Sequence, residues 1–428
     1  MKSFRTPKLL ESENFQFLAK VRTVNQYCLL RRKKCYLRFE IITLIDMQIF
    51  DIHQRIGILG GGQLGKMLTL AAANWHAPIY ILEKSNRYSA GRLATRFVQG
   101  DFKDYEDVYF FGKHTDILTI EIEHVNTAAL HQLVKEGVIV HPAPDKLDII
   151  KDKGLQKQFY AHHALPTSSF QLFEDAAAIQ NAIDNQQLRY PFVQKSRTAG
   201  YDGKGVAVIR SKDDPLMKTA SLVEPLVDID KEIAVIVARN PNGQIEAFPP
   251  VEMLFHPTAN LVEFLACPAR ISEAVVMAAI QLAKQTIQTY DICGLLAVEM
   301  FLTKSGELLI NEVAPRPHNS GHHTIDSCYT SQFEQHIRAI TNLPLGSTKL
   351  TSPAVMLNLL GEAAHTGKTD YLGLKECLSM EGVYVHLYGK ATTRPFRKMG
   401  HVTIVNEDME KAIEIAGEVK KRLKVVAQ

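Results

Sequence analysis

Two glutamates in the second half of the chain are predicted to share one face of a β-hairpin. Two apolar runs flank a Gly-bearing break at 303–306, and Glu299 lies in the first run. Asn311 and Glu312 end the second run. With the turn centred on the break, Glu299 lies opposite Ile310, and Glu312 falls on the same face one diagonal step away. Neighbouring carboxylates repel unless a cation separates them. Mg²⁺ takes few carboxylate oxygens and completes its coordination with substrate phosphates, so we predict Mg²⁺ here, with Asn311 as a neutral ligand.

The alternative is an amphipathic hairpin whose glutamates face water, and the next segment argues against it. Residues 314–322, Ala-Pro-Arg-Pro-His-Asn-Ser-Gly-His, combine a guanidinium, an imidazole and an amide. This density of Pro and Gly excludes regular helix or strand. Ordering such a loop costs conformational entropy, and a polar loop does not offset this cost by packing in a core. We therefore predict that the loop belongs to a functional site.

A second strand–loop–strand unit carries a lysine and a glycine-rich loop. One strand ends near Lys195, and the loop contains Gly-Tyr-Asp-Gly-Lys-Gly at 200–205. The lysine can meet a phosphate as a point charge while backbone N–H groups of the loop cover it. Because the loop joins two strands, it corresponds to the glycine flap of kinases and not to a Walker P-loop. The alternative is a hairpin turn with surface lysines, which requires fewer residues.

Between these units lie carboxylates that could hold a nucleoside. The run 221–227 is predicted to be a strand that enters a linker, where Glu224 could accept a hydrogen bond from adenine while the backbone pairs with the base. Glu232 opens the next strand and could bind ribose hydroxyls. Taken singly, each glutamate is as well explained by a structural role. Upstream, a helix predicted over 145–161 carries Lys151, Lys153 and Lys157.

The first glycine motif opens a predicted α/β domain. A buried-strand pattern leads into residues 60–65, Gly-Gly-Gly-Gln-Leu-Gly, and Glu83 closes the next strand. The spacing matches the dinucleotide fingerprint GxGxxG, although any α/β turn that approaches a ligand needs such glycines. Strand and helix patterns alternate, which predicts a doubly wound domain over 47–147. Glu121 and Glu123 stand at the carboxyl end of its fourth strand, where such sheets bind ligands.

The C-terminal part is predicted to be a separate domain over 343–428 with a basic turn. Two strand patterns precede the basic segment 389–401, and a final helix is predicted over 407–425. The clustered basic groups could bind a substrate phosphate; a solvated basic loop is the alternative. The turn lacks the interleaved aromatic residues of nucleic-acid platforms.

Composition places the chain among globular proteins. Its 428 residues, 46% hydrophobic and 22% charged, suffice for two or three domains. No apolar run approaches the ~18 residues of a membrane span. The six cysteines are scattered, without a CxxC pair. We therefore predict a protein of the reducing cytoplasm that contacts neither membrane nor nucleic acid.

The first 46 residues differ from the rest in charge. They hold ten Lys/Arg and four Asp/Glu, a balance of +6, which leaves 3 − 6 = −3 for the remainder. They could be a nucleic-acid or membrane tail or a targeting peptide. We favour translation from Met47, so that 1–46 is an extension of doubtful authenticity that we expect to be disordered.

Four motifs in this order resemble one family. They are GGGQLGKM at 60–67, GYDGKG at 200–205, NEVAPRPHNSGHH at 311–323 and RKMGH at 397–401. Together they are similar to the ATP-grasp superfamily and, within it, to the N5-carboxyaminoimidazole ribonucleotide synthase family, over about residues 53–405. The resemblance implies an N-terminal doubly wound α/β domain and a central ATP-grasp domain of two α+β subdomains over 148–342. A small β-rich C-terminal domain would follow.

The resemblance also implies a reaction. ATP would phosphorylate bicarbonate to carboxyphosphate, and the carboxyl would pass to the amine of 5-aminoimidazole ribonucleotide, with release of ADP and phosphate. ATP and Mg²⁺ would be the cofactors, and the protein would be a homodimer. The metal ligands would be Glu299 and Glu312.

The remaining site residues follow from the same resemblance. The ATP contacts would be Lys153, Lys195, Gly200, Tyr201, Asp202, Gly203, Lys204, Gly205, Glu224, Pro225, Leu226, Val227, Glu232, Asn311 and Glu312. The catalytic residues would be Arg316, His318, Asn319 and Asp202. The substrate contacts would be Gly62, Gln63, Leu64, Glu121, Lys390 and Arg397.

Two positions depart from the family pattern, and three rival functions stay open. Lys153 replaces a usual arginine, which keeps the charge but loses bidentate geometry. A family histidine is displaced: Phe255 holds its register and His256 follows, so neither is assigned. The rivals are a formate-dependent glycinamide ribonucleotide transformylase, a dinucleotide-dependent dehydrogenase and a nucleic-acid-binding protein led by the basic N-terminus.

Overall fold

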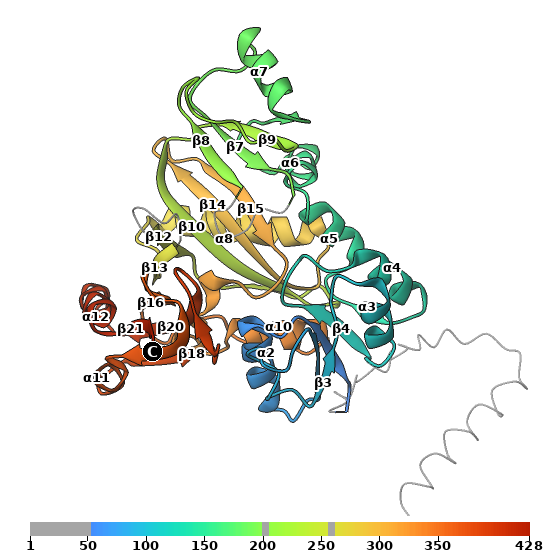
Figure 1. Cartoon of the computed structure of the whole chain (residues 1–428), viewed down its shortest axis with the longest axis vertical. Coiled ribbons are helices and arrows are strands. Elements are labelled where there is room, and N and C mark those ends of the chain that lie inside the picture. The colour runs from blue at the N-terminus through green and yellow to red at the C-terminus, as the bar shows by residue number, and fades with distance from the viewer. Residues whose placement is uncertain (1–52, 199–204, 256–261) are drawn as a thin grey trace, which may run out of the picture. The chain divides into compact units, whose positions relative to one another are not determined.

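The computed structural model describes residues 53–198, 205–255 and 262–428 (Figure 1). Three sequence predictions lie outside these residues. They are the extension over 1–46 with its start at Met47, the loop from Gly200 to Lys204, and His256. Among the described helices, none combines the length and hydropathy that a membrane crossing requires.

The N-terminal domain is a parallel sheet in the order β3-β2-β1-β4-β5. Its strands are β1 (Ile56–Leu59), β2 (Ile79–Glu83), β3 (Arg96–Gln99), β4 (Ile117–Ile120) and β5 (Ile139–Val140). Strands β1 and β4 are buried along their whole length, as expected where helices cover both faces. The covering helices are α2 (Gln63–Ala73) on one face and α3 (Tyr105–Gly112) and α4 (Thr127–Lys135) on the other. The predicted doubly wound α/β fold is confirmed.

The single helix predicted over 145–161 is wrong. The chain forms α5 (Pro144–Ile150) and α6 (Lys153–His162), separated by Asp152 in an extended conformation. The Asp152 carboxylate accepts hydrogen bonds from the backbone N–H groups of Gly154 (2.7 Å) and Leu155 (3.2 Å). Aspartate is a preferred N-cap because it satisfies such orphan donors. The new helix start places Lys153 in the first turn of α6.

A small antiparallel sheet follows in the order β6-β9-β7-β8. Its strands are β6 (Gln171–Phe173), β7 (Phe192–Ser196), β8 (Val206–Ile209) and β9 (Ser221–Pro225). Helix α7 (Ala176–Asp184) packs on it through Ile179, against Phe192, Ile209 and Val223. The glycine-rich loop joins β7 to β8, as predicted.

The large sheet is antiparallel, in the order β15-β14-β10-β12-β13-β16-β20-β18, with β11 paired to β10 (Figure 1). Its strands are β10 (Ile229–Arg239), β11 (Ile245–Ala247), β12 (Val251–Phe255), β13 (Val262–Cys267), β14 (Gly294–Thr303), β15 (Leu308–Ala314), β16 (Ala354–Leu360), β18 (Val383–Leu387) and β20 (Lys398–Val405). Helices α6 and α8 (Glu273–Tyr290) cover one face of β10 and β14, and α10 (Gln332–Ile340) covers the other. Because β13 pairs with β16, the sheet continues past residue 342, and the domain boundary placed there stays a prediction.

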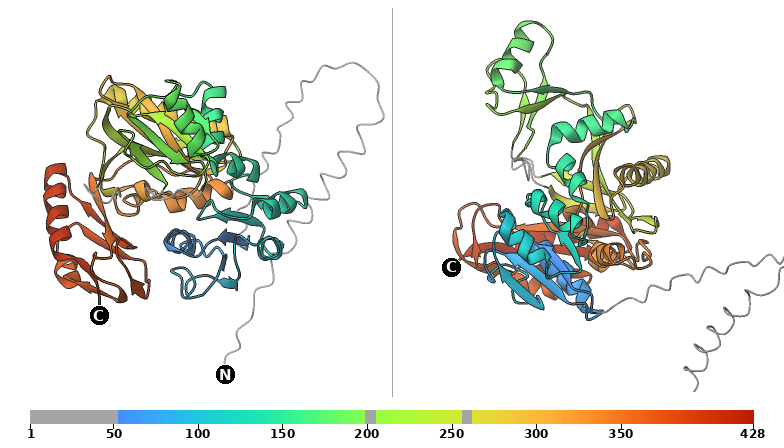
Figure 2. Two further views of the ribbon diagram at one scale, coloured as in Figure 1. Left: turned by 45° about the horizontal axis from the view of Figure 1, so that its top comes forward. Right: turned by 90° about the vertical axis from the view of Figure 1, so that its right-hand side faces the viewer.

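Two C-terminal elements differ from those predicted. Helix α12 (Met409–Arg422) ends early, and β21 (Lys424–Ala427) follows it to pair with β17 (Gly367–Leu372), which also pairs with β19 (Thr392–Thr393). The basic turn is also shorter than predicted, since β20 already begins at Lys398. Figure 2 shows α12 beside the C-terminal strands, where it and α11 (Leu374–Leu378) form one core with β16, β18 and β20.

Candidate active site

The hairpin of β14 and β15 brings the two predicted metal ligands directly opposite each other. Glu299 pairs with Glu312, whereas Met300 already pairs with Ile310, so the register shifts by one residue. The predicted partner of Glu299, Ile310, is therefore wrong. The shift leaves Asn311 as the extra residue of a β-bulge, a feature that re-aims side chains and cannot be recognised from alternation alone.

The two carboxylates experience opposite shifts in pKa. Burial, the Glu312 carboxylate and then Glu232 raise the pKa of Glu299. Burial also opposes ionisation of Glu312, but the Lys153 ammonium outweighs it together with Lys195, and the pKa of Glu312 is lowered. Two adjacent carboxylates repel each other when both are ionised, and a cation between them relieves this repulsion.

This arrangement fits the predicted Mg²⁺. Within 53–198, 205–255 and 262–428, no group of three or more His, Cys, Asp or Glu side chains could hold a metal ion by itself. Mg²⁺ commonly takes only one or two protein carboxylates together with phosphate oxygens. Glu299 and Glu312 supply such a pair, directly opposite each other across the hairpin.

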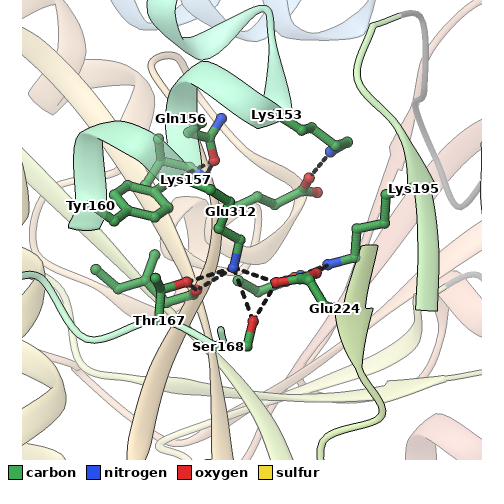
Figure 3. Close-up of polar contacts among 12 residues, drawn as sticks. Lys153, Gln156, Lys157, Tyr160, Thr167, Ser168, Lys195, Glu224 and Glu312 are labelled. Atoms are coloured by element: carbon green, nitrogen blue, oxygen red, sulfur yellow. Dashed lines mark hydrogen bonds and ion pairs between the residues drawn. The ribbon is translucent and has the colours of Figure 1, made fainter. Parts of the chain in front are cut away.

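Lysines from two elements surround the carboxylates (Figure 3). Lys153, at the start of α6, forms an ion pair with Glu312. Lys195, on β7, donates a hydrogen bond to Asn311 Oδ1 (2.8 Å) and forms an ion pair with Glu224 (2.6 Å). The site therefore collects predicted ATP contacts from a helix, the small sheet and the large sheet.

Sequence reasoning left Lys157 without a role, although it lies at the centre of this group in Figure 3. It is one helical turn after Lys153 on α6, and i,i+4 spacing places both on one face. Its ammonium forms an ion pair with Glu224 (2.6 Å) and donates to Ser168 Oγ (3.2 Å) and the Ile310 carbonyl (3.3 Å). The helical spacing of the two lysines was the signal that could have identified it.

The predicted nucleoside contacts lie near this group. The Glu224 carboxylate, on β9, is engaged by lysines, so its predicted side-chain contact with adenine stays a prediction that competes with these ion pairs. Pro225 ends β9, and Leu226 and Val227 follow it. Glu232, on β10, lies opposite Phe301, and burial raises its pKa to about 7.

The loop after β15 contacts both the carboxylate pair and the N-terminal domain. His318 Nε2 lies 3.2 Å from Glu299 Oε1, and Arg316 Nε lies 2.8 Å from Glu123 Oε1. Gln332 holds the loop, because it accepts from the His318 N–H (2.9 Å) and donates to the His318 carbonyl (2.8 Å). Asn319 Oδ1 is buried and finds no hydrogen-bond partner in the described part of the chain. The loop thus joins the end of β4 to the predicted metal site.

Three family models match the chain in succession. They are a ribonucleotide synthetase preATP-grasp domain (residues 53–151), an ATP-grasp domain (158–333) and a phosphoribosylaminoimidazole carboxylase C-terminal domain (354–415). The N5-carboxyaminoimidazole ribonucleotide synthase of Bacillus subtilis is 36% identical over 84% of this chain and 93% of its own length. The crystal structure of the N5-carboxyaminoimidazole ribonucleotide synthetase from Thermotoga maritima has a TM-score of 0.81 and 44% identity, and the match covers 88% of this chain and all of that one. The chain belongs to the N5-carboxyaminoimidazole ribonucleotide synthase family.

Two further comparisons bear on this family membership. The Aspergillus clavatus synthase in complex with ADP and 5-aminoimidazole ribonucleotide has a TM-score of 0.78 and 31% identity, and the match covers 86% of this chain and 99% of that one. The chain spans about two thirds of the length of the curated phosphoribosylaminoimidazole carboxylases it matches. As a member of the synthase family, the protein is an ATP-grasp ligase, which confirms the family prediction.

In this member of the synthase family, the glycine motif does not present free donors to a dinucleotide. The backbone N–H groups of Gly62 and Gly65 both donate to the Glu121 carboxylate at 2.5 Å, and that of Gly61 donates to Glu83 (3.1 Å). A Cβ on Gly62 would lie 2.6 Å from a Glu121 oxygen, so only a glycine at this position leaves room for the Glu121 carboxylate. With these donors engaged, the motif gives no support to the dehydrogenase interpretation, and the same hydrogen bonds compete with the predicted contact of Gly62 with the substrate. Gln63 and Leu64 begin α2 directly beside Glu121.

The remaining predicted substrate contacts of the synthase lie near the end of β18. Lys390 donates to the Lys398 carbonyl (2.7 Å), and Arg397 donates to the Thr392 carbonyl (2.6 Å). Lys66 of α2 donates to the Leu387 carbonyl (2.6 Å), which joins the glycine-motif helix to this strand end. This hydrogen bond links the first glycine motif to the strand that leads into the basic turn, across more than 300 residues of sequence.

Proposed function

We propose that the protein catalyses the ATP-dependent carboxylation of 5-aminoimidazole ribonucleotide with bicarbonate in purine biosynthesis. The products are N5-carboxyaminoimidazole ribonucleotide, ADP and phosphate. The observation that carries the proposal is the direct pairing of Glu299 with Glu312, with Lys153 and Lys195 close by. It occurs in a chain that matches synthases over nearly their whole length.

The reaction needs charge neutralisation at the phosphate that is transferred. A bicarbonate oxygen attacks the terminal phosphorus of ATP, the bond to the bridging oxygen breaks, and ADP leaves. Lys153 and Lys195 bind the phosphates and offset the negative charge on the transferred group. Glu299 and Glu312 would hold Mg²⁺ beside Asn311, and the bound ion would supply further positive charge to the phosphate oxygens.

The second half of the reaction uses the loop after β15. Carboxyphosphate gives its carboxyl group to the amine of the ribonucleotide, the carbon–oxygen bond to phosphate breaks, and the amine loses a proton. Arg316, His318 and Asn319 line the pocket for this intermediate, and the ion pair of Arg316 with Glu123 fixes the guanidinium. Carboxyphosphate hydrolyses readily, so water must be excluded. From the sequence we assign this role to the glycine loop at 200–205, and we assign Asp202 as a substrate contact.

The binding roles complete the proposal. Residues 224–227 bind adenine and Glu232 binds ribose. The ribonucleotide is bound at the N-terminal domain and the basic turn by Gly62, Gln63, Leu64, Glu121, Lys390 and Arg397. Support comes from the Lys66–Leu387 hydrogen bond, which joins the glycine-motif helix to the end of β18, two residues before the basic turn. The cytoplasm and a homodimeric assembly remain part of the proposal.

A substrate-dependence assay tests the function. We expect ADP release by the full chain with MgATP only when 5-aminoimidazole ribonucleotide and bicarbonate are both present. Omission of either substrate serves as the control. Stimulation by formate with glycinamide ribonucleotide instead would contradict the proposal and assign the protein to the transformylases.

A further inference from the structure

A cluster of three charged side chains lies beneath the predicted phosphate site. Lys157, Glu224 and Lys195 come from α6, β9 and β7, and the exposed fractions of their side chains are 2%, 4% and 11%. Each oxygen of the Glu224 carboxylate binds one lysine at 2.6 Å, Oε1 to Lys157 and Oε2 to Lys195 (Figure 3). The cluster carries one net positive charge when all three groups are ionised.

The two lysines differ in their other contacts. Lys157 also donates to Thr167, Ser168 and the Ile310 carbonyl, and Ser168 in turn donates to Glu224. All of these partners belong to the protein. Lys195 is the more exposed lysine, and besides Glu224 it contacts the amide oxygen of Asn311, which lies next to Glu312. Lys157 is therefore fixed, whereas Lys195 faces the metal and phosphate site.

Strand pairing explains why Lys195 reaches Glu224. Lys195 pairs with Leu222 across β7 and β9, and Glu224 lies two residues further along β9 on the same face. Such diagonal neighbours lie within reach of long side chains. A small rotation of the Lys195 side chain can exchange the carboxylate for another anion without moving either strand.

We propose that Lys157 is a positioning residue for ATP binding: it remains the counter-ion of Glu224 while Lys195 leaves this carboxylate for a nucleotide phosphate. The inference rests on the proposed role of Lys195 as an ATP contact. With Lys157 present, departure of Lys195 leaves a neutral buried pair. Without Lys157, the same movement leaves a buried carboxylate unpaired, which is strongly unfavourable. Lys195 would then stay on Glu224, and the phosphate would lose its cation.

The test measures nucleotide affinity in the full chain with Lys157→Met, which keeps the length of the side chain but removes the charge. Titration calorimetry with MgADP should show a Kd at least about 10-fold higher than that of the wild type. In steady-state assays KM for ATP should rise while KM for 5-aminoimidazole ribonucleotide stays unchanged. A purely structural role would not move these two constants separately. Lys151→Met is the matched control, since Lys151 lies two residues before α6 and bonds the Val125 carbonyl instead.

The double variant Lys157→Met/Glu224→Gln removes both charges of the fixed pair and keeps the test decisive if the single variant does not fold. It should bind MgADP within about three-fold of the single variant Glu224→Gln, because Lys195 has no carboxylate to hold it in either protein, and the comparison cancels the predicted contact of Glu224 with adenine. Wild-type affinity in Lys157→Met, or a folded double variant that binds more than about 10-fold weaker than Glu224→Gln, would overturn the inference alone. A wild-type chain that binds no nucleotide would overturn the proposed function as well.

Discussion

Glu299 and Glu312 are direct cross-strand neighbours of β14 and β15, and the bulge at Asn311 makes them so. Without the bulge, the register of Met300 with Ile310 would place Glu299 opposite Asn311 and Glu312 on the other face of the sheet. Direct pairing brings two carboxylates together and turns the intervening amide toward Lys195. The strand register thus adds the repulsion of Glu312 to the burial that raises the pKa of Glu299.

Neutralising either carboxylate should stop turnover without unfolding the protein. We expect Glu312→Gln and Glu299→Gln each to lower kcat at least about 100-fold, because preorganised charge at the transferred phosphate is lost. Circular dichroism and thermal unfolding should remain close to those of the wild type. Glu307→Gln, at an exposed position of the same hairpin, is the matched control. A wild-type rate in Glu312→Gln would refute the assigned site.

The glycine motif should depend on Glu121 for stability. Glu121→Ala removes the acceptor of the Gly62 and Gly65 N–H groups, so we expect the free energy of unfolding to fall by about 2 kcal/mol. Urea titration measures this change, with Glu106→Ala on the exposed surface of α3 as the control.

NADH should not bind the wild-type chain, and measurable binding would revive the dinucleotide interpretation.

The basic turn should contribute to binding of 5-aminoimidazole ribonucleotide and not to binding of ATP. Lys390→Ala is expected to raise KM for 5-aminoimidazole ribonucleotide about 10-fold or more, because a charge-assisted contact to its phosphate is lost. KM for ATP should not change, since Lys153 and Lys195 lie at the other site. Arg394→Ala, an exposed change in the same turn, provides the comparison. Equal effects of the two substitutions on KM would show that only the overall charge of the turn matters.

Acid sensitivity should arise in part from a buried histidine between α10 and β4. His336 Nε2 lies 2.9 Å from Thr119 Oγ1, and burial, with His141 nearby, lowers the pKa of His336 to about 3. The unfolded histidine titrates near 6.5. Below that pH the unfolded chain binds a proton that the folded chain does not, so stability is fully present above about 6.5 and falls as the pH decreases toward 3.

The variant His336→Gln should therefore lose less stability on acidification. Between pH 7.5 and pH 5 we expect its free energy of unfolding to fall about 2 kcal/mol less than that of the wild type. Urea unfolding at the two pH values measures the difference, and exposed His114→Gln is the control. The same pH dependence in His336→Gln and the wild type would exclude His336 as the titrating group.

Some elements could be predicted from local pattern and others could not. Strands β1 and β4 are short apolar runs, and they lie where the sequence predicts them, directly before the glycine motif and before Glu121. The sequence predicted one helix where the structure has α5 and α6, because the apolar pattern continues on both sides of Asp152. The side chain of Asp152 caps the start of α6. The end of α12 was misplaced because β21 forms only through its pairing with the distant β17.

The sequence by itself determined the family and the order of its motifs, and it supplied the candidate ATP contacts, because ordered motifs and local periodicity are carried by neighbouring residues. Only the tertiary structure decided that Glu121 occupies the glycine motif, that Glu123 holds Arg316, and that Lys157 neutralises Glu224. These contacts join residues far apart in the chain. They exist because packing brings separate helices and strands together, and no local pattern encodes the partner of a buried charge.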